Sequence, residues 1–434
     1  MTTNTYSVGL DFGTTNTVIT TITPSGERIH HSFNSDLGDS RNFRSLICYW
    51  DEDEQGMPVL DHSSGPYGIS DYLEWGSDQR LIMSMKNYLG DKSFSRTQIL
   101  SRQLSIEDMI AHVLQDLLAK TEISLTQSEL NVVAGRPVVF AGARADESLA
   151  LERLGRAFER AGLSNVEFAY EPAAAGYKFG KSGNAKGLVL VADFGGGTSD
   201  FSILKLEEGA ERRYKPIAHS GVGIAGDRFD AKIFDFAIAP MLGKGSSYDS
   251  FGKSVPVPWQ PGNFMWHRMA LMQNKKDLQY WKSLCRHSYE PEKIKRLVHI
   301  IEEGLLFQIN RLVLKAKEEL SRQQTTVIDL KEIGLDVEIP LSRQEFELCI
   351  RDELEKIETS IEDVLKNAEI ESGQIDQVFM TGGTSHTPAV RQIFIDLFGA
   401  DKIRGGNEFS SVADGLAEMA FDKFTANYSH GSFG

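Results

Sequence analysis

The clearest pattern along the chain is an apolar run that ends in one carboxylate and a row of glycines. Residues 189–192 are apolar, Asp193 follows, and Gly-Gly-Gly occupies positions 195–197. From 200 to 206 polar and apolar side chains alternate, the spacing of a strand with one buried face. We predict a β-hairpin whose turn is formed by the glycines.

Two other segments repeat parts of this pattern. Near the N-terminus an apolar run reaches Asp11, passes through Gly-Thr-Thr at 13–15 and resumes as a strand at 18–22. A third apolar strand at 378–381 ends in a Gly-Gly pair. One such hairpin alone is more often an ordinary turn than a nucleotide site, but its recurrence at domain-sized separation predicts an internal duplication.

The composition of these turns suits phosphate. Glycines lack a Cβ, so consecutive backbone N–H groups can converge on an anion, and Thr198 adds a hydroxyl donor. An aspartate at the end of the preceding strand can hold a hydrated Mg²⁺, which prefers oxygen ligands and keeps most of its waters. We therefore interpret the hairpins as a phosphate grip.

The pattern between the hairpins alternates strands with amphipathic helices, which indicates an α/β fold. Capping boxes predict two helix starts, at Ser105–Asp108 and at Ser342–Glu345. The predicted elements are a helix over 106–118, a buried strand over 130–137, a helix from about 143 to 161, a helix from 342 to about 368 and a last helix at 412–424.

Composition narrows the class of protein. The 434 residues are enough for more than one core, and 41% hydrophobic with 25% charged residues is typical of a soluble globular protein. A net charge of −15 argues against nucleic acid and membrane surfaces as partners. The first residues lack the features of a secretion signal and the three cysteines are scattered, so we expect a cytoplasmic protein.

At these motifs the chain resembles the ATPase domain of the heat shock protein 70 chaperones, within the superfamily that includes actin and sugar kinases. The resemblance runs from about Tyr6 to about Ala420. It implies an α/β fold of the actin-like ATPase type, with two ribonuclease-H-like lobes around a nucleotide cleft. The lobes would be 1–186, joined by a returning helix at about 409–425, and 187–408, with an insertion at about 243–305.

The resemblance implies ATP or ADP with Mg²⁺ as ligands. Asp11 and Asp193 would hold the hydrated metal. Glu171 would orient the attacking water or accept its proton, Lys86 would offset charge on the terminal phosphate, and Asp200 would help to arrange the water. The phosphates would contact the residues of the two turns, Gly13, Thr14, Thr15, Gly195, Gly196, Gly197 and Thr198, and the last of these also belongs to the catalytic set.

The residues by themselves leave plainer interpretations open for two of these side chains. Glu171 precedes a proline, and a glutamate at a helix start commonly complements the helix dipole. Lys86 lies in an apolar, helix-like segment at 80–90, where a lysine is usually a surface residue with a buried stem.

The same resemblance implies that adenosine contacts Lys317, Ser321, Gly382, Gly383 and His386. Three positions depart from the family pattern. Leu314 replaces an acid that contacts the ribose, Glu318 replaces a basic residue, and His386 stands where a basic residue stacks on adenine. We therefore predict weaker recognition of the base.

The segment 243–290 has no family counterpart over most of its length. It holds three of the five tryptophans of the chain, Trp259, Trp266 and Trp281. We favour a packed insertion over an exposed protein-binding surface.

The function expected from these observations is slow ATP hydrolysis by a chaperone-like protein. The linker and peptide-binding domain of the family have no counterpart in this sequence, so the partner is expected to be a protein client or co-factor of unknown identity, and simple apolar peptides are not expected to change the ATPase rate. Three interpretations remain beside this one. They are a small-molecule kinase of the same superfamily, an actin-like nucleotide-dependent scaffold or polymer, and a relative that has lost nucleotide binding.

Overall fold

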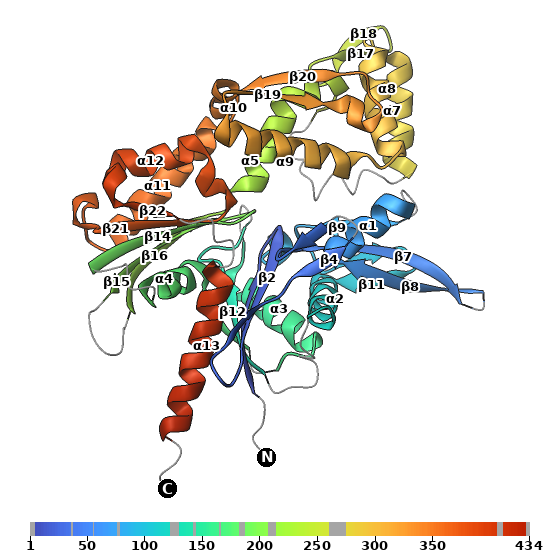
Figure 1. The fold of residues 1–434 in the computed structure, drawn as a ribbon. Helices are drawn as coiled ribbons and strands as arrows, with labels where there is room; N and C mark the ends of the chain where they lie inside the picture. Colours follow the sequence, from blue (N-terminus) through green and yellow to red (C-terminus); the bar gives the residue numbers. More distant parts are fainter. Residues whose placement is uncertain are drawn as a thin grey trace. The chain divides into compact units, whose positions relative to one another are not determined.

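The computed structural model describes residues 5–35, 38–54, 56–75, 79–121, 130–141, 145–164, 166–181, 187–206, 214–259, 275–405 and 411–430. The chain forms two compact units (Figure 1). The first unit comprises Met1–Asp71, Met83–Ala225 and Glu355–Gly434, and the second comprises Tyr72–Ile82 and Gly226–Leu354. These bounds differ from those of the two predicted lobes, which stay a prediction.

The first unit contains a six-stranded sheet built around the N-terminal hairpin. Its strands are β1 (Tyr6–Phe12), β2 (Asn16–Ile22), β3 (Arg28–His30), β6 (Phe43–Arg44), β12 (Leu130–Arg136) and β13 (Val166–Tyr170). The order is β13-β12-β1-β2-β3, and β6 pairs with β2. β1, β2 and β3 run antiparallel in sequence, whereas β12 and β13 lie parallel to β1. The predicted first hairpin is confirmed.

A second sheet in the same unit repeats this arrangement. Its strands are β14 (Gly187–Phe194), β15 (Ser199–Leu206), β16 (Tyr214–Val222), β21 (Gln377–Thr381) and β22 (Ile403–Gly405). The order is β16-β15-β14-β21-β22, again three antiparallel strands followed by two parallel ones. Both the central hairpin and the internal duplication are therefore confirmed, and so is the α/β fold class.

Two helices of the first unit pack against each other; the first also packs against strands of both sheets, and the second against the N-terminal sheet. They are α4 (Glu171–Lys181) and α13 (Ser411–His430). One buried cluster joins Val133 of β12, Ala174 of α4, Val191 of β14 and Leu416 of α13. The fold therefore places α4, which starts at Glu171, in the shared core of the two sheets.

Two further helices were predicted from the sequence, the first of them with its cap. In α2 (Ile106–Ala119) the capping box is formed, because Ser105 N donates to Asp108 Oδ2 at 2.9 Å and Asp108 N donates to Ser105 Oγ at 3.2 Å. The helix expected from about 143 is α3 (Glu147–Arg160). It starts later because Asp146 caps it, accepting from Leu149 N at 2.9 Å.

The segment 80–90, predicted to be helix-like, is not an α-helix. It forms β9 (Arg80–Met83) and then a 3₁₀ turn over Met85–Tyr88. Ser84 separates them with φ of 54°, a left-handed conformation that interrupts regular structure. The prediction was wrong because an apolar run this short does not distinguish strand from helix.

The other elements outside the two central sheets include small sheets, one of them β8-β7-β9, and three further helices. They are β4 (Phe33–Ser35), β5 (Gly38–Ser40), β7 (Leu46–Glu54), β8 (Met57–Ser64), α1 (Gly65–Trp75), β10 (Arg96–Ile99), β11 (Arg102–Ser105), α11 (Arg351–Asn367) and α12 (Pro388–Phe398).

The second unit contains the segment 243–290, which was predicted to be a packed insertion. Its elements are α5 (Gly226–Ile233), a π-helix (Phe234–Ile238), a 3₁₀ turn (Ala239–Leu242), β17 (Ser247–Ser250), β18 (Lys253–Pro256), α7 (Lys275–His287), α8 (Pro291–Glu302), α9 (Leu306–Arg322), β19 (Thr325–Asp329), β20 (Glu338–Ser342) and α10 (Arg343–Cys349). Trp281 is buried, and Trp259 Nε1 donates to Asp235 Oδ1 at 3.2 Å, as expected of a packed insertion, while Trp266 lies outside the described residues.

The capping box at Ser342 and Glu345 is formed, but the long helix predicted from it is interrupted. α10 ends at Cys349 and α11 begins at Arg351.

Over the part of the chain that is described, no helix has the length and apolar character needed to cross a membrane.

Candidate functional site

The two central hairpins have the same register and the same turn. Asp11 pairs with Val18 in the first hairpin, and Asp193 pairs with Asp200 in the second. Each turn is closed by one backbone bond of 3.0 Å, from Gly13 N to Asn16 O and from Gly195 N to Thr198 O. Each aspartate therefore stands at the same point, two residues before the first glycine of its turn.

The two turns approach each other at Gly197. A Cβ placed on Gly197 would lie 2.7 Å from Thr14 Oγ1 and 2.8 Å from Asn87 Oδ1. Thr14, Gly197 and Thr198 are buried, while Gly13, Thr15 and Gly196 remain partly accessible and Gly195 is exposed. Because a larger side chain has no room there, backbone N–H groups and hydroxyls are what the two turns can offer to an anion.

Replacement of Gly197 by Ala is expected to weaken ATP binding about tenfold, because the methyl group must displace Thr14 or Asn87, and overpacking of this kind costs about 1–3 kcal/mol. Titration of a fluorescent ATP analogue would measure the change. Gly373→Ala is the matched control, since a Cβ there meets no atom within 4 Å. Unchanged affinity in the Gly197 variant would contradict the assignment of this turn.

Lys86 and Glu171 form a buried ion pair. Lys86 Nζ lies 2.6 Å from Glu171 Oε1, and the two side chains are 7% and 8% exposed. The 3₁₀ turn after Ser84 carries Lys86, and Glu171 is the first residue of α4, directly after β13. Glu171 thus lies at a helix start, as its position before a proline predicted, and the fold brings Lys86 to it.

Three aspartates lie near this pair: Asp193 and Asp200 are buried, and Asp11 is partly buried, with its Oδ1 atom fully covered. Burial, and next the charge of Glu171, raise the pKa of Asp11 to about 7 and the pKa of Asp193 well above its ordinary value. The same two causes raise the pKa of Asp200 to about 7. Burial would lower the pKa of Lys86, but the charges of Glu171 and Asp11 outweigh it and raise that pKa. Four carboxylates thus share one lysine, an excess of negative charge that favours a bound cation.

Asp11 fits the role of a cation ligand. Its Oδ1 is buried and has no hydrogen-bond partner among the residues that are described, and such an atom is costly unless something binds it. Within those same residues no three His, Cys, Asp or Glu side chains gather as they would around a bare metal ion. A hydrated Mg²⁺, which needs few direct protein ligands, is the form that suits Asp11 and Asp193.

Asp200 has a structural role beside its predicted one. Its Oδ1 accepts from Val138 N at 2.7 Å and from Val139 N at 3.3 Å. These bonds fix the loop after β12 against β15. The predicted contribution of Asp200 to the water arrangement stays a prediction.

Asn87 is a site residue that sequence reasoning missed. Its Oδ1 is buried beside Gly197 and has no partner among the described side chains and backbone. It directly follows Lys86 on the same 3₁₀ turn, and its adjacency to that lysine was the only available signal.

The third glycine pair lies beside the central hairpin. Gly382 has φ of 84°, and a Cβ there would lie 2.0 Å from Phe194 O, so only glycine fits. Gly383 begins a 3₁₀ turn that ends at the exposed His386. Gly382 and Gly383 therefore lie close to the end of β14, which carries Asp193.

Lys317 and Ser321 belong to the second unit, on α9. Lys317 Nζ lies 2.7 Å from Asp230 Oδ1, and Ser321 Oγ donates to Lys317 O at 3.1 Å. Their predicted contacts with adenosine stay a prediction.

Comparison with known proteins points in one direction. The family model described as "Hsp70 protein" matches residues 78–249 and 279–421, ranges that include Lys86, Glu171 and Asp193 but not Asp11. Chaperone protein DnaK of Deinococcus radiodurans is 26% identical over 435 residues, covering 95% of this chain and 59% of the relative. Chaperone protein DnaK of Deinococcus deserti is 25% identical over 432 residues, with the same coverage. The chain thus spans 59% of the length of these relatives.

Proposed function

Because the chain belongs to the heat shock protein 70 family, we propose that it binds ATP with a hydrated Mg²⁺ and hydrolyses ATP slowly to ADP and phosphate. The observation that best supports the proposal is the position of two neighbouring side chains. A single 3₁₀ turn brings Lys86 to Glu171 and the next residue, Asn87, to Gly197. A charged pair suited to catalysis therefore lies beside the glycine turns suited to phosphate.

The residues divide the work between binding and chemistry. The turns at 13–15 and 195–198 bind phosphate oxygens through backbone N–H groups and hydroxyls, and Asp11 and Asp193 hold the hydrated metal. Mg²⁺, when bound, neutralises charge on the phosphates. Lys86 stabilises negative charge that develops on the transferred group, and Glu171 orients a water molecule and accepts its proton.

Slow turnover is expected from the same set of residues. Phosphoryl transfer depends mainly on positioning and electrostatic stabilisation, and sites without a partner's arginine turn over slowly. The family relatives that match are named as chaperones, and we propose that this ATPase cycle likewise serves a protein client or co-factor. The family match does not favour the kinase or scaffold interpretation.

Release of labelled phosphate from a single turnover tests the proposal. Hydrolysis of ATP is expected at about 10⁻² per second or less, and only with Mg²⁺. GTP is expected to react at a similar rate, because the residues Leu314, Glu318 and His386 weaken base recognition, and each hydrogen bond that they do not make is worth about 0.5–1.5 kcal/mol. No Mg²⁺-dependent release from either nucleotide would refute the proposal.

A further inference from the structure

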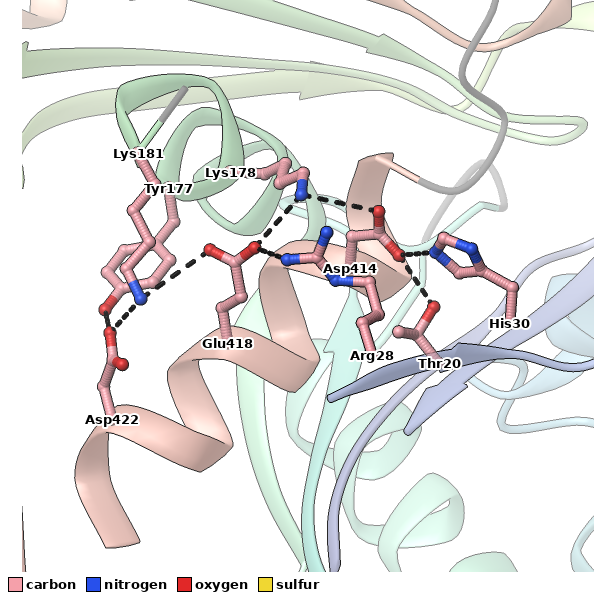
Figure 2. A network of polar contacts seen from close by, with 9 residues as sticks. All are labelled: Thr20, Arg28, His30, Tyr177, Lys178, Lys181, Asp414, Glu418 and Asp422. Atoms are coloured by element: carbon pink, nitrogen blue, oxygen red, sulfur yellow. Dashed lines mark hydrogen bonds and ion pairs between the residues drawn. The ribbon is translucent and has the colours of Figure 1, made fainter. Parts of the chain in front are cut away.

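Helix α13 carries two acidic side chains that are almost completely buried. The side chains of Asp414 and Glu418 are 4% and 8% exposed. They are four residues apart, so they project from the same face of the helix, one turn from each other (Figure 2). Buried carboxylates are retained only where partners compensate for the lost hydration, and both residues have several.

Asp414 is bound mainly by the N-terminal sheet. Its Oδ1 accepts from Thr20 Oγ1 of β2 at 2.9 Å and lies 2.8 Å from His30 Nε2 of β3. Its Oδ2 lies 3.7 Å from Lys178 Nζ of α4. One carboxylate therefore contacts both the first hairpin and the helix that starts at Glu171.

Glu418, one helical turn after Asp414, likewise contacts both the N-terminal sheet and α4. It pairs with Arg28 of β3, and its Oε1 lies 3.1 Å from Lys178 Nζ. Its Oε2 lies 3.7 Å from Lys181 Nζ, which also pairs with Asp422 at 2.5 Å. Figure 2 shows the resulting chain of contacts from β2 and β3 across α13 to α4.

Close backbone contacts connect α13 to the elements that carry the site residues. A Cβ on Gly9 of β1 would lie 2.1 Å from Ala413 O, and a Cβ on Gly415 would lie 1.9 Å from Ala174 O of α4. Gly9 is two residues before Asp11, and Ala174 is three residues after Glu171. α13 thus lies directly against both elements that carry site residues, without an intervening layer that could absorb a shift.

We propose that Asp414 and Glu418 are positioning residues, which hold α4 and the first hairpin in the relative position that hydrolysis requires. The inference rests on the proposed ATPase function and deepens it. Lys178 anchors α4 to α13. Thr20 anchors the hairpin to Asp414, and Arg28 and His30 anchor β3, the strand paired with β2 of the hairpin, to the same two carboxylates. Glu171 and Asp11 therefore keep their spacing because both of their elements are bound to one helix.

The test compares Glu418→Gln with the parent in single-turnover hydrolysis and ATP titration. Loss of the shared charge is expected to lower the rate of hydrolysis about tenfold or more, because a misplacement of about 1 Å can cost about 100-fold. ATP affinity is expected to change less than the rate. Lys178→Gln, which removes a partly exposed cation, gives the same direction of effect if Glu418→Gln fails to fold, and Lys178→Arg is expected to restore most of the rate.

The matched control is the ion pair of the same helix that is exposed to solvent, Lys423 with Glu167, where both side chains are 57% exposed. Lys423→Gln is expected to hydrolyse ATP at the parental rate. A second readout separates positioning from general destabilisation. In a Glu171→Gln background the Lys178→Gln substitution is expected to have no further effect on the rate, since it acts through Glu171.

The outcomes are distinct. If the parent hydrolyses ATP and the Glu418→Gln and Lys178→Gln variants do so at the same rate, the positioning role is wrong and the proposed function stands. The positioning role is also wrong if Lys178→Gln slows hydrolysis by the same factor in the parent and in the Glu171→Gln background. A parent without Mg²⁺-dependent hydrolysis overturns both.

Discussion

Replacement of Glu171 by Gln is expected to slow ATP hydrolysis about 10²–10⁴-fold, while ATP affinity changes by less than about threefold. Glu171 Oε1 accepts the 2.6 Å bond from Lys86, and the side chain is buried within a cluster of aspartates. Glutamine keeps the shape and a hydrogen-bonding oxygen but cannot accept a proton from water. A general base acts in the transition state, so the loss falls on the rate rather than on binding.

Single-turnover phosphate release and an ATP titration measure the two quantities separately. Glu167→Gln is the matched control, because Glu167 lies on the preceding strand β13 and is exposed. Thermal unfolding of both variants checks that Lys86, left without its carboxylate partner, does not unfold the protein. Hydrolysis at the parental rate would mean that Glu171 is only a helix-start residue.

Asp11→Asn is expected to abolish the Mg²⁺ dependence of ATP binding and to weaken binding in Mg²⁺ about 10–100-fold, since bonds to a charged group contribute about 1.5–3 kcal/mol. The same variant is expected to be more stable than the parent without nucleotide. Burial raises the pKa of Asp11 from its ordinary 3.8 to about 7, so the ionised carboxylate is disfavoured in the folded state.

The effect of the Asp11 carboxylate on the stability of the folded protein depends on pH. A raised pKa in the folded state means that stability is greatest below pH 3.8 and is lost as the pH rises through about 7. The difference in melting temperature between Asp11→Asn and the parent should therefore grow from pH 5 to about pH 8. Asp336→Asn, at an exposed position, is the control for loss of one charge. A lower melting temperature for Asp11→Asn at about pH 8 would contradict this expectation.

Much of the site could be predicted because its motifs are local. The hairpins at Asp11 and Asp193 and the junction at Glu171 each depend on a few consecutive residues whose conformations are restricted by glycine or proline. The capping boxes at Ser105 and Ser342 depend on two side chains three positions apart. The structure confirms all of these elements.

Other features depend on contacts between distant segments, for which the sequence carries little or no signal. Asp414 and Thr20 are 394 positions apart, and nothing near either residue indicates the hydrogen bond between them. Asn87 became a site residue only because Gly197 is folded against it. The 80–90 segment was misassigned because the left-handed conformation of Ser84, which separates strand from 3₁₀ turn, is not encoded by a glycine.

The central claim is that these buried carboxylates and facing turns form an Mg²⁺·ATP site. Isothermal titration of ATP into the purified protein, first in excess Mg²⁺ and then with the metal chelated, tests it most directly. We predict one site per chain that binds in Mg²⁺ and weakens by about tenfold or more without it. Binding of equal strength in both conditions, or no binding in either, would contradict the claim.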